Sequence, residues 1–136
     1  MTREKVVKET MNPFDYVDPA IDLTSNKTIS IIIEFKTKPA KIAVLESEAK
    51  GIPLTIEEAQ QNVEESHAKF HNELHTLLDN KQGPYTIKHT YKTVFNGVSM
   101  ELPANEIKRL AESSSVVSKI YLNKKIQLDP PIPPSF

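Results

Sequence analysis

Four histidines are the side chains in this sequence with the clearest potential for chemistry. His67, His71 and His75 recur every four residues, and His89 stands apart from them. Helical residues four apart lie on one face, so two of these imidazoles could share a metal ion if a third ligand, such as Glu64, converged on it. No such convergence is evident from the sequence. The sequence therefore favours a structural or flanking role for the three histidines and predicts no metal site. The alternative is pH sensing by buried histidines.

Other candidates for catalysis are weaker. The carboxylate pairs Glu57-Glu58 and Glu64-Glu65 are adjacent in a helical pattern and point in different directions, as on a solvated helix face. The serines of "ESSSVVS" have no neighbouring base. The chain has 3 glycines, too few for a phosphate-binding glycine-rich loop, and no cysteine, which excludes thiolate metal sites and cysteine nucleophiles. We expect a domain without catalytic residues and without a cofactor.

The histidine trio lies on the strongest helix signal in the chain, in residues 53–80. Thr55 and Glu58 have the spacing of a capping box, which marks a helix start. Apolar residues then recur at three- and four-residue steps and trace one stripe, made of Ile56, Ala59, Val63, Phe70, Leu74, Leu77 and Leu78. His67 falls inside this stripe, so we expect it to face the core.

Alternating runs predict the strands. Residues 28–35 place Ile29, Ile31, Ile33 and Phe35 on one face. Residues 85–95 alternate likewise, and we expect Tyr85, Tyr91 and Phe95 to pack under the helices rather than to stack on RNA bases. Asn96-Gly97, which separates this run from the next one, is typical of a tight hairpin turn. Residues 116–128 predict the last strand.

Two shorter helices complete the pattern, one in residues 40–50 and one from Pro103 to residue 114. The order is β-α-β-β-α-β with an extra short helix before the long one. Right-handed crossovers convert this order into an α+β, ferredoxin-like fold, a four-stranded antiparallel sheet with helices on one face and extended termini. We expect a loosely held arm at 1–27, a domain at 28–128 and a proline-rich tail or linker at 129–136.

Composition sets limits on the partners. There are 17 Lys and Arg against 18 Asp and Glu, a formal net charge of -1, which gives no reason to expect nucleic acid or an anionic membrane as a partner. No run of about 18 apolar residues is present. The polar residues 1–10 lack the apolar core of a signal peptide, so we expect none within this chain.

One long stretch carries a resemblance. "YKTVFNGVSMELPANEIKRLAESSSVVSKIYLNKKIQL" resembles the C-terminal half of the subtilisin propeptide, or inhibitor, family. The junction Phe95-Asn96-Gly97-Val98 is its most specific piece, and Val117 and Ile120 match apolar positions of the family's last strand. "KTISIIIEFK" is similar to its first strand. The resemblance covers about residues 28 to 128, and the longer segment after Pro39 is similar to pro-regions of minor extracellular, Vpr-like proteases.

The resemblance implies a function that needs no catalysis. The chain would be the pro-region of a secreted subtilisin-like serine protease, acting as an intramolecular chaperone and temporary inhibitor in a zymogen-like precursor. Its open sheet face would pack on the protease, and its C-terminal segment would lie extended in the substrate cleft by β-augmentation. The implied partner is the cognate protease domain, in cis or in trans, and the implied location is extracellular.

The register of the resemblance also implies the contact residues. Family members often carry acidic residues beside the last-strand positions, where they cap protease helices; here the matching residues are Tyr121 and Asn123. The cleft-binding segment would comprise Ile126, Gln127, Leu128 and Asp129, with Ile126 toward a hydrophobic S4 pocket. Asp129 would suit the S1 pocket of a typical subtilisin poorly, and the scissile bond stays open.

Two other functions fit the sequence. One is a stand-alone protease inhibitor of the same fold, with no protease in its own gene. The other is a ferredoxin-like regulatory domain that binds a small ligand or self-associates through its sheet, because this scaffold carries many unrelated tasks.

Overall fold

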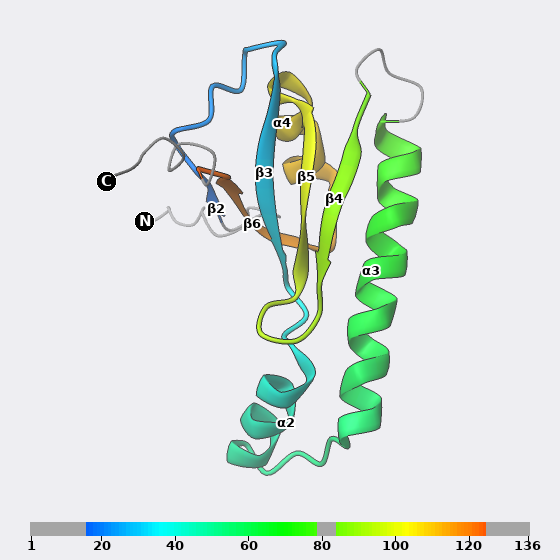
Figure 1. Ribbon diagram of the computed structural model, residues 1–136. Coiled ribbons are helices and arrows are strands. Elements are labelled where there is room, and N and C mark those ends of the chain that lie inside the picture. The colour runs from blue at the N-terminus through cyan, green and yellow to red at the C-terminus, as the bar shows by residue number, and fades with distance from the viewer. Residues whose placement is uncertain (1–15, 79–83, 125–136) are drawn as a thin grey trace, which may run out of the picture.

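The computed structural model describes residues 16–78 and 84–124 (Figure 1). In chain order its elements are β2 (Tyr16–Val17), β3 (Thr28–Phe35), α2 (Ala40–Ala49), α3 (Ile56–Leu78), β4 (Thr86–Tyr91), β5 (Gly97–Pro103), the short 3-10 turn η1 (Ala104–Glu106), α4 (Ile107–Ser113) and β6 (Val117–Leu122). The predicted α+β class is confirmed, and so is the order of the predicted elements.

The sheet has the strand order β2-β6-β3-β5-β4. The four longer strands pair antiparallel in the ferredoxin-like order, as the sequence predicts. The difference is a fifth strand, β2, which pairs parallel with β6. It belongs to the segment expected to be a loose arm, and part of that segment is instead packed on the domain, because Val17 and Ile21 lie against the core. A strand of two residues is too short to leave a periodic signal in the sequence.

The core lies between one face of the sheet and the two helices α3 and α4, with α4 behind β3 and β5 in Figure 1. The alternation predicted for the first strand is confirmed, since Ile31 and Ile33 are fully buried. They form one cluster with Phe70 and Leu74 of α3 and with residues of α4. Both helices therefore cover the same face of the sheet, and no described helix covers the other.

The start of α3 is built as the capping box predicts. The Glu58 amide donates to the Thr55 hydroxyl at 3.0 Å, and the Thr55 amide donates to the Glu58 carboxylate at 2.9 Å. Within the predicted stripe, Ala59, Val63, Phe70, Leu74 and Leu78 are buried, Leu77 is half-buried against the core, and Ile56 in the first turn is exposed. His67 is buried within the stripe, as expected.

The connection between β4 and β5 differs from the prediction of a two-residue turn. Gly97 is already the first residue of β5 and pairs with Tyr91, so the loop is made of residues 92–96. Gly97 is required by space rather than by a turn. A Cβ atom on this residue would lie 1.9 Å from the Ile33 carbonyl oxygen of the neighbouring strand.

The expectation that Tyr85, Tyr91 and Phe95 share the core side is also wrong. The register of β4 against β5 shifts between Ile87 and His89. Such a bulge moves the residues beyond it to the opposite face. Tyr85 packs against the core, but Tyr91 lies on the helix-free face and is 36% exposed.

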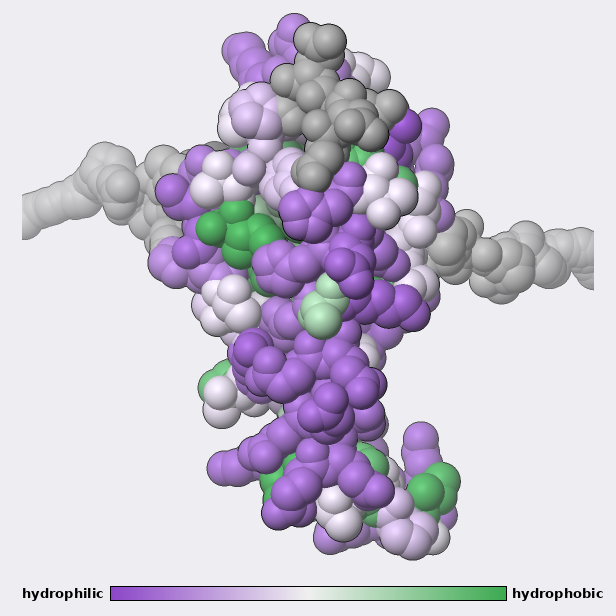
Figure 2. Space-filling view, turned by 90° about the vertical axis from the view of Figure 1, so that its right-hand side faces the viewer, coloured by the Kyte–Doolittle hydropathy of each residue, from purple (hydrophilic) through white to green (hydrophobic). Residues whose placement is uncertain are grey.

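The extra helix α2 does not cover the sheet. It lies beyond the sheet's end, beside the start of α3 (Figure 1), and none of its residues is buried. Gly51 follows it with a φ of 73°, a conformation that glycine adopts freely. Ile42 and Leu45 of α2 are exposed, and hydrophobic residues are visible at this end of the molecule in Figure 2. Among the described residues, the helices are all too short or too polar to cross a membrane.

Candidate functional site

The fold leaves the helix-free face of the sheet without a described covering element. Strand pairing arranges its side chains in three rows across the sheet. The rows are Thr86, Glu101, Ser30 and Asn123; His89, Ser99, Ile32 and Tyr121; and Tyr91, Gly97, Glu34, Lys119 and Tyr16. We call these residues the open face.

The open face mixes polar, aromatic and aliphatic groups. Two tyrosine rings, Tyr16 and Tyr121, pack with their centroids 5.5 Å apart. Glu34 and Glu101 are its described carboxylates, both half-buried, and Lys119 lies beside Glu34 in the register. The Ser99 hydroxyl is buried without a hydrogen-bond partner among the described residues. A surface of this kind suits a protein partner better than a small polar substrate.

The last described strand, β6, contributes the end of the described chain to this face. Beyond β6, the Asn123 amide donates to the Ser30 carbonyl at 2.9 Å, and its side chain donates to the Ser30 hydroxyl at 3.2 Å. Tyr121 is half-buried against Tyr16. Both sequence-predicted contact residues therefore lie on the open face, at the end of the described part of the chain. The remaining predicted residues, Ile126, Gln127, Leu128 and Asp129, lie outside the described residues.

The sequence interpretation missed Asp18. Its carboxylate accepts hydrogen bonds from the amide of Ala20 at 2.9 Å and from the amide of Leu122 at 3.1 Å. These two bonds, with Lys124 nearby, lower the pKa of Asp18 below its usual range. The Asp18-Pro19 pair is a turn signal that marks this place. We call Leu122 and Asn123, with their partners Asp18 and Ser30, the chain exit.

In the family-like junction at residues 95–98, Phe95 is half-buried and the other three residues are buried. Asn96 is 1% exposed, and its side-chain amide donates to the Thr37 carbonyl at 2.9 Å and to the Ser66 hydroxyl at 3.1 Å. Because a carbonyl can only accept, the amide nitrogen must face Thr37. The amide oxygen then faces the Nε2 atom of His67, 2.8 Å away. These four residues form the Asn96 network.

This geometry fixes the proton on His67. The Asn96 oxygen accepts, so Nε2 carries the hydrogen and Nδ1 is left buried without a hydrogen bond from the described residues. Burial lowers the pKa of His67, and the Lys92 cation adds to this, while the bond to Asn96, the nearby Tyr91 backbone and the charge of Glu64 act in the opposite direction. The neutral ring is therefore the form that fits the fold.

The other junction residues have packing roles. Val98 is fully buried, and the Phe95 ring lies against Gly97. Val117 and Ile120, which match the family's last strand, are fully buried in β6. The junction therefore joins the helix α3 to the end of the sheet and contributes no exposed reactive group.

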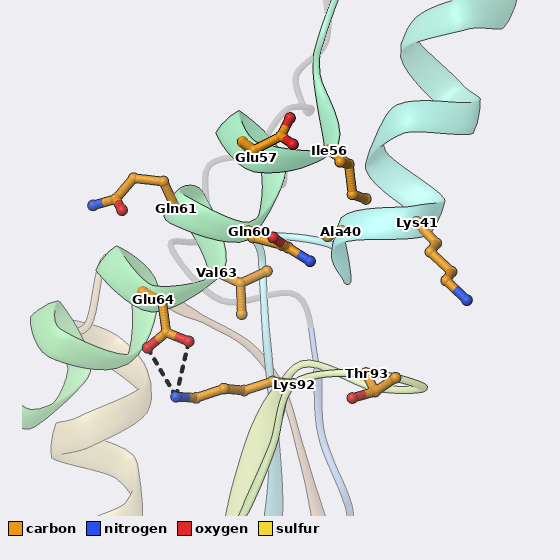
Figure 3. A pocket seen from close by; sticks show the side chains of 10 residues that line it. All are labelled: Ala40, Lys41, Ile56, Glu57, Gln60, Gln61, Val63, Glu64, Lys92 and Thr93. Atoms are coloured by element: carbon orange, nitrogen blue, oxygen red, sulfur yellow. Dashed lines mark hydrogen bonds and ion pairs between the residues drawn. The ribbon is translucent and has the colours of Figure 1, made fainter.

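A groove of about 510 Å³ lies between α2, the first turns of α3 and the loop after β4 (Figure 3). Val63 points into it, and the Lys92 ammonium pairs with the Glu64 carboxylate at 2.8 Å at its side. This pair lowers the pKa of Glu64. Glu64, the possible third metal ligand, is thus engaged with Lys92. Within residues 16–78 and 84–124, no group of three metal-ligating side chains converges.

Comparison with known proteins gives one family. The model of peptidase inhibitor I9 matches residues 30–129, most of the chain. No match was found among curated proteins or among solved structures. The match begins within β3, at Ser30, covers the described residues from there to Lys124, and also spans the segment predicted to bind the cleft.

Proposed function

The chain belongs to the peptidase inhibitor I9 family, the family of non-catalytic inhibitory propeptides of subtilisins, and on that premise we propose that it is the pro-region of a secreted subtilisin-like protease. In this role it assists folding of the protease and inhibits it until it is removed. The observation that carries the proposal is the position of β6, which lies within the open face and leads directly into the C-terminal segment.

The open face supports docking on a folded protein. It presents aromatic and aliphatic groups from four of the five strands, β2, β3, β4 and β6, without a described helix above it, and Tyr121 and Asn123 lie at its β6 side. A partner that binds this face and does not bind the unfolded protease would favour the native protease by mass action. Such assistance needs no reactive group, in accordance with the packing roles of the junction residues.

The acidic contacts expected of the family have other candidates here. Tyr121 and Asn123 carry no charge, but Glu34 and Glu101 lie on the same face, on β3 and β5. A carboxylate is stabilising beside the N-terminus of a helix, where backbone amides have no partner in the helix. We propose that these two residues take the capping role that the positions of Tyr121 and Asn123 do not fill.

The C-terminal segment supplies the inhibition. We propose that Ile126, Gln127 and Leu128 lie extended in the substrate cleft and pair with it through backbone hydrogen bonds, with Asp129 following. A stand-alone inhibitor would use the same contacts in trans, so the two possibilities differ in gene organisation and agree in mechanism.

The test is inhibition of the subtilisin-type proteases encoded in the same genome. The full chain is expected to inhibit one of them at concentrations below those that inhibit an unrelated protease such as trypsin. A chain that ends after Lys124 keeps every described contact of the chain exit and removes only residues 125–136. It is expected to stay folded by circular dichroism and to lose inhibition.

Two results would contradict the proposal. Unchanged hydrolysis by all of these proteases, over a wide range of concentrations of the full chain, would exclude inhibition. Equal inhibition by the full and the shortened chain would exclude the cleft-binding segment and would leave the open face as the inhibitory surface.

A further inference from the structure

The first described residues of the chain hold the last ones. β2 pairs parallel with β6, and the Asp18 amide donates to the Ile120 carbonyl at 2.8 Å. Backbone pairing between the described residues of the two strands ends there. The next amide on the same edge of β6, that of Leu122, donates a hydrogen bond to the Asp18 carboxylate at 3.1 Å. A side chain therefore extends the ladder to the last residue of the strand.

The Asp18 carboxylate is itself fixed in place. Its second oxygen accepts the Ala20 amide at 2.9 Å, and its backbone carbonyl accepts the Ile21 amide at 3.0 Å. Ile21 is 7% exposed and belongs to the core cluster. The turn that presents Asp18 is thus attached to the core of the domain.

The opposite edge of β6 is held independently. There the Asn123 amide and side chain both bond to Ser30 of β3. Consecutive residues of a strand direct their backbone groups to opposite edges, so Leu122 and Asn123 are bound from the two sides. Hydrogen bonds to Asp18 and Ser30 therefore hold the chain from both sides at Leu122 and Asn123, the last described residues before Lys124.

We infer that Asp18 is a positioning residue, which sets the place and direction in which the C-terminal segment leaves the sheet. The inference rests on the proposed function for its consequence, because the segment so directed is the one proposed to enter the cleft. A pre-oriented segment binds more tightly than a free one, since less conformational entropy is lost on binding.

The chemistry requires both carboxylate oxygens. One oxygen accepts from Ala20 and the other from Leu122. Asparagine has nearly the same shape but one oxygen, and its amide nitrogen would face one of these two donors. Asp18→Asn therefore breaks one of the two bonds with little change in volume.

The matched control is Asp22→Asn. The Asp22 carboxylate also accepts local hydrogen bonds, from the amide and hydroxyl of Thr24, and its pKa is also lowered. It makes no described contact with β6. The two substitutions remove the same charge from the same segment and differ in whether the chain exit is touched.

The experiment measures amide hydrogen exchange by NMR in the full chain. In Asp18→Asn the charged acceptor of the Leu122 amide becomes either a neutral oxygen or an amide nitrogen, so its hydrogen bond is weakened or lost. The Leu122 amide is therefore expected to exchange up to about tenfold faster, relative to the Met100 amide in the core. Inhibition of the protease is expected to weaken by about three- to tenfold. Asp22→Asn is expected to change neither quantity.

Each outcome separates this inference from the proposed function. Unchanged exchange at Leu122 overturns the positioning role, whether or not the chain inhibits. Faster exchange with unchanged inhibition overturns its functional consequence alone. A wild-type chain that fails to inhibit contradicts the proposed function, and the exchange measurement still decides whether Asp18 positions Leu122. Asp18→Glu is a second variant, which keeps both carboxylate oxygens but moves them. If Asp18→Asn and Asp18→Glu both fail to fold, Asp18 is required for the stability of the core and is not a positioning residue.

Discussion

The Asn96 network and the chain exit both use a polar side chain to hold backbone groups, but in opposite surroundings. Asn96 is 1% exposed and bonds to Thr37, Ser66 and His67 in the interior, whereas the residues of the chain exit are half-buried at the end of β6. The first carries the family-like junction and faces no partner. The second has little sequence signature and precedes the segment proposed to act. The residues that identify the family in the sequence and the residues proposed to act on the protease are therefore located in different parts of the domain.

The largest expected effect tests whether the junction is structural. Gly97→Ala places a Cβ atom where the Ile33 carbonyl oxygen lies 1.9 Å away, and backbone cannot move aside cheaply. We expect a loss of about 3 kcal/mol or more in the free energy of unfolding, measured by urea denaturation.

Gly51→Ala is the matched control. Gly51 has a φ of 73°, and a Cβ atom on it would meet nothing within 4 Å, so the substitution costs backbone strain without a clash. We expect a loss of about 1 kcal/mol. Equal losses for the two glycines would show that the close approach of β5 to β3 is not what requires Gly97.

The next effect removes the Asn96 network. Asn96→Ala leaves the Thr37 carbonyl and the His67 Nε2 hydrogen buried without a partner. We expect a loss of about 2 to 4 kcal/mol in the free energy of unfolding, and unchanged inhibition per folded molecule. Asn72→Ala, on the exposed side of α3, is the control and is expected to be nearly neutral.

A smaller loss in the free energy of unfolding is expected when the pH is lowered. Burial lowers the pKa of folded His67, so the unfolded chain binds this proton more readily than the folded one. Its contribution to stability is complete above the unfolded histidine pKa, about 6.5, and is lost as the pH falls from there through the lower folded-state pKa. Denaturation between pH 7 and pH 5 measures it.

His67→Gln can still donate to Asn96 but does not titrate, so it is expected to flatten this pH dependence. His71→Gln, at an exposed position one helical turn away, is expected to keep it. An equal slope for wild type and His67→Gln would mean that other groups cause the loss of stability in acid.

The smallest effect on stability, and the sharpest on function, is expected on the open face. Glu34→Gln and Glu101→Gln remove charges from half-buried side chains of that surface. We expect each to leave the free energy of unfolding within about 0.5 kcal/mol of wild type and to weaken inhibition several-fold. Glu112→Gln on α4, on the other side of the sheet, should leave inhibition unchanged; a similar loss there would indicate a general charge effect.

Structural features that depend on a regular spacing of neighbouring residues were predictable from the sequence. The capping box of Thr55 and Glu58, the stripe of α3 and the alternation of β3 follow from spacing alone, and the structure contains all three. The family was predictable from the junction at Phe95 to Val98, where buried contacts determine which residues fit at Asn96, Gly97 and Val98.

The predictions that were wrong or missing depend on contacts between residues that are distant in the sequence. The tight turn at Asn96-Gly97 was a reasonable prediction from two residues, but Gly97 is required by its contact with Ile33, far away in the chain. The bulge at Ile87 to His89 changes the face of Tyr91 without changing the alternating pattern that suggested it. The same limit applies to Asp18, whose partner Leu122 has no counterpart in the local sequence.

The bond between Asp18 and Leu122 joins residues 104 positions apart. Closing so long a loop costs more entropy than any hairpin of the sheet, and contacts of this kind slow folding. β6 must first align beside β3 and the N-terminal turn must pack on the core before the two residues can meet. We therefore expect the chain exit to be among the last parts of the domain to form, so that the orientation of the C-terminal segment would report that the whole domain has finished folding.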